Sequence, residues 1–277
     1  MKYPVLLPII FDYPFTYESS LKLKIGDYVN VPFGKKIITG IIWDKFENND
    51  NKNFKIKSIK DKLNIEPLKT ETINFLNWFS EYNLVPLGMT LKLHLLSGNG
   101  VEKKNKSEYE NYQSKSNKEE FKLSDEQEKA FKNIIKNDSF FRVHLLQGTT
   151  GSGKTIVYFK AIEKIIAKGL QTLILLPEIG LTGEFEKKFK IFFGFEAAIW
   201  HSKIAPKKKK LIWSGLSNGN IKVIIGARSA LFLPFQNLGL IVVDEEHDQS
   251  FKQDEGVTYN ARDMAIARAH SEDIPIN

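Results

Sequence analysis

Short apolar runs, separated by glycine, proline and asparagine, fill the first 97 residues of the chain. The runs VLLPII, DYVNVPF and KKIITGIIW have the length and residue types of β-strands, and KIKSIK is a weaker candidate. Apolar residues then recur at Ile73, Leu76 and Phe79, a spacing that predicts a helix with Thr70 as its N-cap. The pattern predicts a small, barrel-like β domain with one helix over residues 1–97.

The composition and the pattern of apolar positions change twice along the chain after this domain. Residues 98–121 are polar and of low complexity, which predicts an exposed linker. From residue 122, helix-like segments alternate with the strand-like runs RVHLLQ, QTLILLP, AAIWH, IKVIIG and LGLIVVD. This alternation predicts an α/β fold built from βαβ units around a parallel sheet. The nearly continuous apolar character of the runs predicts helices on both faces of that sheet.

The segment GTTGSGKT, residues 148–155, follows the first of these strands and opens a helix that ends at Gly169. It fits the phosphate-binding pattern G-x-x-x-x-G-K-[ST] at every position. Its glycines let backbone N–H groups surround phosphate oxygens, and the helix amino terminus adds a positive dipole end. Lys154 is expected to contact the β- and γ-phosphates, and Thr155 to offer a hydroxyl to Mg²⁺. The predicted ATP site consists of Gly148, Thr149, Thr150, Gly151, Ser152, Gly153, Lys154 and Thr155.

A group of acids follows the apolar run of the last strand, in the order Asp244-Glu245-Glu246-His247-Asp248. Carboxylates this close repel each other, so a cation is expected among them. A P-loop site needs a second strand tip with an acid that holds the metal, and we assign Mg²⁺ to Asp244 together with Thr155. Glu245 is the candidate to orient and deprotonate the attacking water. Without the P-loop, a solvated strand end would explain these acids better.

Composition restricts the class of protein. The 277 residues carry a net charge of +7, which permits a nucleic-acid partner but is equally explained by solvated lysines. Without cysteine, the sequence contains no disulfide and no thiolate zinc site. No apolar run reaches about 18 residues, so no membrane partner is expected and a cytoplasmic location is the default.

Four segments in combination resemble the PriA (primosomal protein N′) family of replication-restart helicases, within superfamily 2. They are GTTGSGKT, LLPEIGLT, GARSALFLPFQNLGLIVVDEEHDQSFKQDEG and YNARDMAIARAHSEDIP. The segment KIGDYVNVPFGKKIITGII is similar to that family's domain for the 3′ end of nascent DNA. The resemblance implies a 3′-DNA-end-binding domain at residues 1–97, a linker at 98–121 and a first RecA-like helicase lobe at 122–277. The implied function is that of an ATP-dependent DNA helicase or translocase, acting at stalled replication forks in replication restart and primosome assembly.

The resemblance also implies roles for single residues. Gln127 lies where such enzymes have a glutamine that reads adenine, but Ser124-x-x-Gln127 is equally a capping box, and one side chain does not easily do both. Phe251 and Tyr259 are expected to stack on bases, and Glu246, His247 and Arg262 to couple nucleotide state to DNA. The implied DNA contacts are Thr16, Tyr17, Lys35, Arg228, Phe251, Lys252 and Tyr259.

Two further motifs match the family's single-strand path. Pro177, Glu178 and Thr182 form one, and Gly226, Arg228 and Ser229 form the other. Turns and caps at strand ends are a fair alternative explanation for every one of these residues except Arg228.

The sequence departs from the family in several places. Thr16 stands where the family has an aspartate that recognises a free 3′-hydroxyl, and threonine brings no charge. Val257 and Thr258 replace an aromatic and a basic residue. The linker is too short and too polar for the family's winged-helix domain. The sequence ends before motif III, so it lacks the family's second RecA-like lobe with its arginine finger, the carboxy-terminal domain and the cysteine ligands for zinc.

Because arginine fingers contribute ~10³–10⁵ in rate, we expect this chain alone to bind Mg·ATP weakly, hydrolyse it slowly and not unwind DNA. The alternative function is a non-catalytic module that binds forks or DNA ends and keeps a residual nucleotide site. Turnover that depends on Lys154 and Glu245, once the carboxy-terminal half is supplied, would separate the two. The implied partners are forked or single-stranded DNA, with primosome and single-strand-binding proteins implied by the resemblance alone.

Overall fold

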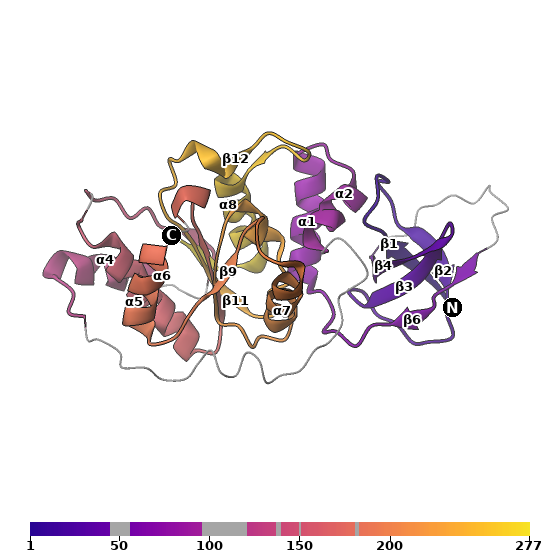
Figure 1. Ribbon diagram of the computed structural model, residues 1–277, viewed down its shortest axis with the longest axis horizontal. Helices are drawn as coiled ribbons and strands as arrows, with labels where there is room; N and C mark the ends of the chain where they lie inside the picture. Colours follow the sequence, from indigo (N-terminus) through magenta and orange to yellow (C-terminus); the bar gives the residue numbers. More distant parts are fainter. Residues whose placement is uncertain (45–55, 96–120, 137–139, 150, 181–182) are drawn as a thin grey trace. The chain divides into compact units, whose positions relative to one another are not determined.

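The computed structural model describes residues 1–44, 56–95, 121–136, 140–149, 151–180 and 183–277. The chain forms two compact units, Met1–Lys104 and Asn105–Asn277, and each has its own sheet (Figure 1). The division falls inside the predicted linker, of which only Phe121 is among the described residues. Phe121 packs within the second unit, where its ring stacks on Phe192 with 5.3 Å between the centroids.

The first unit is built on a curled sheet in the order β5-β2-β1-β4-β3-β6. Its strands are β1 (Lys2–Leu6), β2 (Phe15–Glu18), β3 (Tyr28–Phe33), β4 (Lys36–Ile42), β5 (Lys57–Ser58) and β6 (Asp61–Lys62). The turn between β5 and β6 joins the two edges, because the Ile59 N–H bonds to Glu18 O at 2.8 Å and the Lys60 N–H to Asn30 O at 2.9 Å. The prediction of a β-rich, barrel-like unit is therefore confirmed.

The described residues of the first unit contain two helices, where the sequence predicted one. Helix α1 (Thr70–Tyr82) is the predicted helix, but its N-cap is Lys69 and Thr70 already lies inside it. Helix α2 (Leu87–His94) has only 8 residues, too few for a clear apolar period. It packs through polar groups as well, since buried His94 Nε2 lies 2.9 Å from the Tyr28 hydroxyl.

The second unit contains a sheet in which all pairings are parallel, as predicted. The order is β7 (Arg142–Val143), β14 (Pro275–Ile276), β11 (Leu238–Val243), β8 (Gln171–Leu175), β10 (Val223–Gly226) and β9 (Ala198–Trp200). Strand β14 was not predicted, because two residues are too few to show the alternation of apolar and polar positions that marks a strand. Only the first two residues of the run RVHLLQ form a strand, β7, which lies at the edge of the sheet. Leu145, in the same run, is 77% exposed. The expectation of a strand covered on both faces is therefore wrong there.

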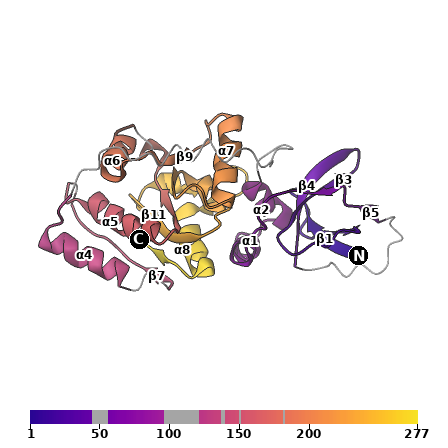
Figure 2. The ribbon, with the colours of Figure 1, turned by 90° about the horizontal axis from the view of Figure 1, so that it is seen from below.

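Helices cover both faces of this sheet, in agreement with right-handed crossovers. Helices α5 (Lys154–Ala167) and α6 (Gly183–Phe193) lie on one face, and α7 (Pro206–Ser217) and α8 (Ala261–Glu272) on the other (Figures 1 and 2). Helix α4 (Asp125–Ile135) packs beside α5. The described residues of this unit also form 3-10 turns at Glu178–Gly180, Arg228–Phe232 and Gln249–Phe251, and a hairpin of β12 (Lys252–Gln253) with β13 (Tyr259–Asn260).

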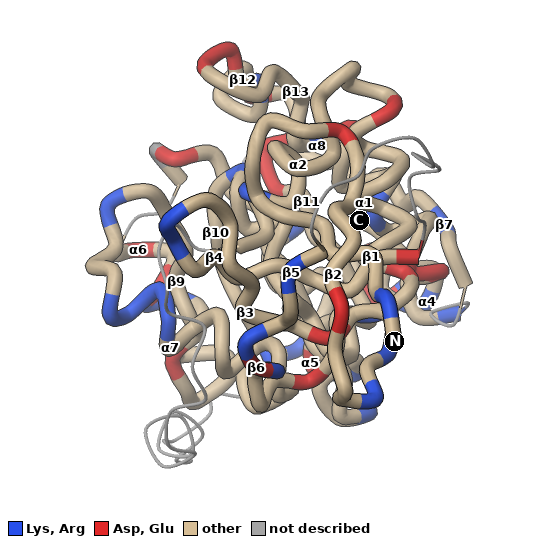
Figure 3. The backbone as a smooth tube through the Cα atoms, turned by 90° about the vertical axis from the view of Figure 1, so that its right-hand side faces the viewer, with Lys and Arg blue, Asp and Glu red and all other residues tan. Residues whose placement is uncertain are grey.

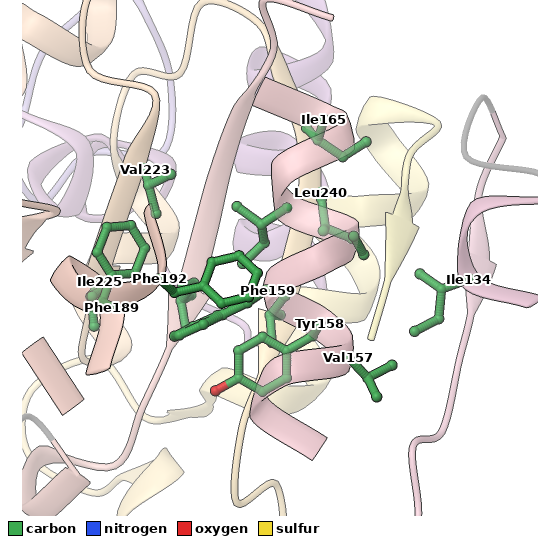
Figure 4. Packing of buried hydrophobic residues seen from close by; sticks show 14 of the residues in the cluster. Ile134, Val157, Tyr158, Phe159, Ile165, Phe189, Phe192, Val223, Ile225 and Leu240 are labelled. Carbon is green, nitrogen blue, oxygen red and sulfur yellow. The ribbon is translucent and has the colours of Figure 1, made fainter. Parts of the chain in front are cut away.

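Helix α5 is held in place by an aromatic core. The Phe159 ring lies 5.6 Å from the Phe189 ring and 5.2 Å from the Phe192 ring, both on α6, and all three are buried (Figure 4). Edge-to-face and tilted ring pairs of this kind add to the stabilisation that apolar burial gives. The amino end of α5, where the P-loop ends, is thereby fixed relative to the sheet.

Candidate nucleotide site

Lys154 and Asp244 line one cavity of about 700 Å³ at the carboxyl ends of β7 and β11. Gly148, Glu245, Glu246 and other residues from both strand ends also line it. Parallel strands end at the same edge of a sheet, which is where open α/β sheets bind ligands. Lys154 and Asp244 therefore lie at the same edge of the sheet, and their binding of one magnesium nucleotide stays a prediction.

The glycine loop has the backbone geometry of a phosphate cradle. Gly151 and Gly153 have φ of +82° and +81°, a region that residues with a Cβ rarely adopt. A Cβ on Gly148 would lie 2.5 Å from Ser152 Oγ. Lys154 Nζ donates to Gly148 O at 2.8 Å, so the lysine folds back over the loop. Thr150 lies outside the described residues.

Gln127 forms the capping box that the sequence offered as one of its two roles, and it also contacts the phosphate loop. Its Oε1 accepts from the Ser124 N–H at 2.9 Å, which completes a capping box on α4. Its Nε2 donates to the Ser152 carbonyl oxygen at 2.9 Å. The capping role is therefore present in the structure, while a contact with adenine stays a prediction, as does the expectation that one side chain does not easily do both.

The acids at the end of β11 are arranged with Asp244 inward and the others outward. Asp244 Oδ1 accepts from the Glu245 N–H at 3.0 Å, and Asp244 Oδ2 accepts from the Tyr158 hydroxyl at 2.8 Å. Glu245 has φ of +52°, a strained conformation for a residue with a side chain. Its carboxylate is 3.7 Å from His247 Nε2, and the side chains of both residues are mostly exposed. Glu245 is thus turned toward solvent, where a water would approach.

Tyr158 is a site residue that the sequence did not single out. It lies one turn after Lys154 and on the same helix face, and it lines the same cavity. Its hydroxyl donates a hydrogen bond to Asp244, and the Thr155 side chain lies nearby. Only its four-residue spacing from the P-loop lysine could have drawn attention to it.

The residues at this edge fit a magnesium ion. In the described part of the chain, no group of three or more His, Cys, Asp or Glu side chains is placed to hold a metal alone. Mg²⁺ usually binds through one or two protein oxygens together with substrate phosphates and waters. Asp244 and Thr155 supply a carboxylate and a hydroxyl that meet at the Tyr158 hydroxyl. Such a donor set suits Mg²⁺ bound with a nucleotide.

Arg262, predicted to take part in coupling, joins the acids to α8. Its Nε lies 2.9 Å from Asp263 Oδ1 and its Nη1 lies 3.2 Å from Glu246 Oε2. Its hydrogen bonds to Asp263 and then to Glu246 raise the pKa of the guanidinium above its ordinary value. Arg262 and Glu246 line the cavity together, which is a suitable position for relaying nucleotide state.

The predicted aromatic contacts with DNA are not available in this structure. Phe251 and Tyr259 are 1% and 3% exposed, and the Tyr259 ring packs edge-on against Phe232. Both rings are buried here, so stacking on bases requires the loop to rearrange, and their expected role stays a prediction. Their apolar neighbours could not be known from the sequence of the loop.

The sequence suggested no structural role for Arg228, but the structure gives it one. Its Nη1 donates to the Lys252 carbonyl oxygen and ties the turn after β10 to β12. Ser229 accepts from Trp200 Nε1 at 3.1 Å, and a Cβ on Gly226 would lie 2.5 Å from the Ala230 Cβ. Pro177 and Glu178 lie at the end of β8, and Thr182 is outside the described residues.

In the first unit, Thr16 and Lys35 are exposed and Tyr17 is buried. The Tyr17 hydroxyl donates to Pro32 O at 3.2 Å, so Tyr17 supports the sheet rather than facing solvent. Lys35 follows Gly34, with φ of +59°, in the two-residue turn between β3 and β4. Thr16 and Lys35 are therefore the accessible members of the predicted contact set here, and Lys252 is exposed in the second unit.

A second hollow, of about 360 Å³, lies between α6, β9 and α7 and is partly basic. Lys187, Lys190 and Lys208 line it, and Figure 3 shows lysine-bearing turns along both helices. Lys190 Nζ is 2.8 Å from Glu196 Oε1, so part of this charge is neutralised locally.

Two family models match the chain. One is the 3'DNA-binding domain (3'BD) of PriA, over residues 4–95, and the other is the DEAD/DEAH box helicase, over residues 124–272. The chain belongs to the DEAD/DEAH box helicase family. Each match lies within one of the two structural units of this helicase chain. Together the matches confirm the resemblance seen in the sequence.

Relatives of this helicase chain are named "Replication restart protein PriA". The protein of Rickettsia conorii is 43% identical over 95% of this chain, which spans 40% of that protein. The protein of Haemophilus influenzae is 30% identical over 98% of this chain and 47% of its own length. The protein of Bacillus subtilis is 42% identical over 56% of this chain and 19% of its own length. The chain thus spans less than half the length of these relatives.

Among solved structures, RecG bound to a three-way DNA junction is similar to this helicase chain. The TM-score is 0.40 and the identity 28%, over 57% of this chain and 24% of RecG. In the ranges that the structure describes, no helix has the length and apolar character of a membrane span.

Proposed function

We propose that this chain contributes the Mg·ATP site and a DNA-end-binding domain to an ATP-driven DNA helicase of the PriA type, acting at stalled forks in replication restart and primosome assembly. The observation that carries the proposal is the shared cavity of Lys154 and Asp244. A P-loop lysine and an aspartate at a strand tip converge in this way where one triphosphate and its metal bind together. The matches to a helicase domain and to a 3′-DNA-binding domain support the same function.

The residues of the cavity divide the chemistry of hydrolysis among them. Backbone N–H groups of the loop from Gly148 to Gly153 hold the phosphates, and Lys154 neutralises charge on the transferred group. Thr155 and Asp244 would hold Mg²⁺, which when bound withdraws electron density from the phosphate oxygens. Glu245 accepts a proton as the water oxygen bonds to the γ-phosphorus and the bond to the β–γ bridging oxygen breaks. The nucleotide product leaves with that oxygen.

The proposed partner is forked or single-stranded DNA with a 3′ end. The exposed Thr16 and Lys35 supply a hydroxyl and a cation on one unit, and Lys252 a second cation near the helicase motifs. Electrostatic contacts of this kind make binding weaken steeply with salt. Primosome proteins, a single-strand-binding protein and a cytoplasmic location belong to the same proposal and rest on the PriA-named relatives.

The test is binding of a fluorescent ATP analogue to the 277-residue chain with Mg²⁺ present. Wild type is expected to bind and Lys154→Ala to lose binding, whereas Lys164→Ala, on an exposed position of the same helix, retains it. Equal binding by Lys154→Ala and wild type would refute the assigned site. Anisotropy of labelled forked DNA then tests the partner, and binding that does not weaken with added salt contradicts it.

A further inference from the structure

The hydroxyl of Tyr158 lies between the two residues assigned to the metal. It donates to Asp244 Oδ2 at 2.8 Å, and the Thr155 side chain lies near it. Tyr158 and Asp244 are 86 residues apart, so this contact joins α5 to the end of β11. It is the direct side-chain link between the P-loop helix and the acidic strand tip in the described part of the chain.

The ring that carries this hydroxyl has little freedom to move. Tyr158 is 2% exposed and belongs to the core cluster, and its ring packs edge-on against Phe159 at 5.2 Å. Figure 4 shows the ring among the buried side chains, with the hydroxyl oxygen at the border of the group. A buried ring in a close-packed core holds its hydroxyl at one place.

The hydroxyl is also a dependable donor. Burial, and then the negative charge of Asp244 and the hydrogen bond to it, hold the pKa of Tyr158 well above its ordinary value. The group therefore stays protonated at neutral pH and donates a hydrogen bond to the Asp244 carboxylate.

Asp244 depends on neutral donors for its orientation. In the described residues its side chain has no ion pair, and its oxygens accept from the Tyr158 hydroxyl and from the Glu245 N–H. The Glu245 N–H belongs to a strained residue with φ of +52°, whereas the tyrosine is anchored in the core. Partners that orient a metal-binding carboxylate change metal affinity without touching the metal.

We propose that Tyr158 is a positioning residue that orients Asp244 toward Thr155 and thereby sets the Mg²⁺ affinity of the nucleotide site. The inference rests on the proposed function and adds a residue to it. It requires that the hydroxyl, and not the ring, determines how strongly Mg²⁺ promotes nucleotide binding.

The experiment titrates Mg²⁺ into the chain with a fluorescent ATP analogue, after measuring binding of the analogue in EDTA. Tyr158→Phe keeps the ring and removes the hydroxyl, and it is expected to raise the half-saturating Mg²⁺ concentration by about tenfold. Binding in EDTA is expected to stay within twofold of wild type, on the order of the scatter of distant substitutions. Tyr28→Phe is the matched control, because it removes a buried hydroxyl in the first unit.

An unchanged Mg²⁺ midpoint in Tyr158→Phe overturns the inference, and so does an equal loss of binding in EDTA, which indicates a purely structural role. Circular dichroism and the thermal midpoint show whether the variant is folded. In an Asp244→Asn background, Tyr158→Phe is expected to cause no further shift of the midpoint, which keeps the test valid if the single variant is destabilised. If wild type itself binds no nucleotide, it is the proposed function that fails.

Discussion

Gln127 and Ser152 are joined by a hydrogen bond from the Gln127 Nε2 to the Ser152 carbonyl oxygen, 2.9 Å long. The bond ties the start of α4 to the phosphate loop. It passes directly over Gly153, since a Cβ on that residue would lie 2.4 Å from Gln127 Nε2. Glycine is thus required at position 153 for two reasons. Its φ of +81° favours glycine, and a side chain there would clash with the Gln127 amide.

Gln127→Glu separates the two contacts of this side chain. Glutamate at the third position of the helix keeps the capping box, because it still accepts from the Ser124 N–H. It removes the amide donor and places a negative charge near the phosphates. We expect nucleotide affinity to fall by about tenfold, as for loss of one good hydrogen bond, with little change in thermal stability.

Ser124→Ala provides the reciprocal control. It removes the cap and is expected to cost about 1 kcal/mol of stability while nucleotide affinity stays close to that of wild type. Fluorescence titration gives the nucleotide affinity of each variant, and thermal unfolding gives the stability of each. If Ser124→Ala lowers affinity as much as Gln127→Glu, the helix as a whole positions the loop and the amide has no separate role.

Glu245→Gln tests the general base. The amide preserves size and exposure but cannot accept the proton, so single-turnover hydrolysis is expected to fall by about 10²–10⁴-fold. Mg-dependent binding of ATP is expected to persist, because Asp244 and Thr155 are unchanged. His247→Gln, which alters the neighbour 3.7 Å away, is the control and is expected to retain the chemical step. Hydrolysis by Glu245→Gln at the wild-type rate would assign the proton transfer to another group.

Local sequence was sufficient to predict the P-loop and the parallel sheet. Gly151, Gly153 and Lys154 form a contiguous pattern whose geometry depends on near neighbours alone. Strands β8, β10 and β11 are runs of buried apolar residues, and such runs predict a covered parallel sheet. The acid at the tip of β11 followed from the same pattern.

Contacts between distant segments were beyond the sequence. Strand β14 lies between β7 and β11 and has only two residues, too few to show an alternation of apolar and polar positions. The bond between Tyr158 and Asp244 depends on the packing of α5 against the sheet. Phe251 and Tyr259 have the composition of stacking residues, but burial decides their role, and burial is a property of the whole unit.

Arg268 is expected to stabilise the second unit far more than a surface charge does. Its side chain is fully buried, donates to Leu231 O and lies 3.2 Å from Glu272 Oε1, which is 2% exposed. Arg268→Met leaves that carboxylate buried without its partner, at a cost of about 3–5 kcal/mol. Lys188→Met breaks an exposed pair of 2.8 Å and is expected to cost about 1 kcal/mol or less. Urea unfolding measures both, and equal costs would contradict the buried assignment.

Thr16→Asp is expected to increase discrimination for a free 3′-hydroxyl. Thr16 is exposed on β2 opposite Pro4, so the substitution alters stability by about 0.5 kcal/mol or less. A carboxylate accepts a hydrogen bond from a terminal hydroxyl and repels a terminal phosphate, which should raise the affinity ratio for the two ends by about tenfold. Anisotropy with matched oligonucleotides measures that ratio. Ser20→Asp adds the same charge at another exposed position of the unit, and an equal change in both variants would show that charge repulsion alone, not recognition at position 16, sets the ratio.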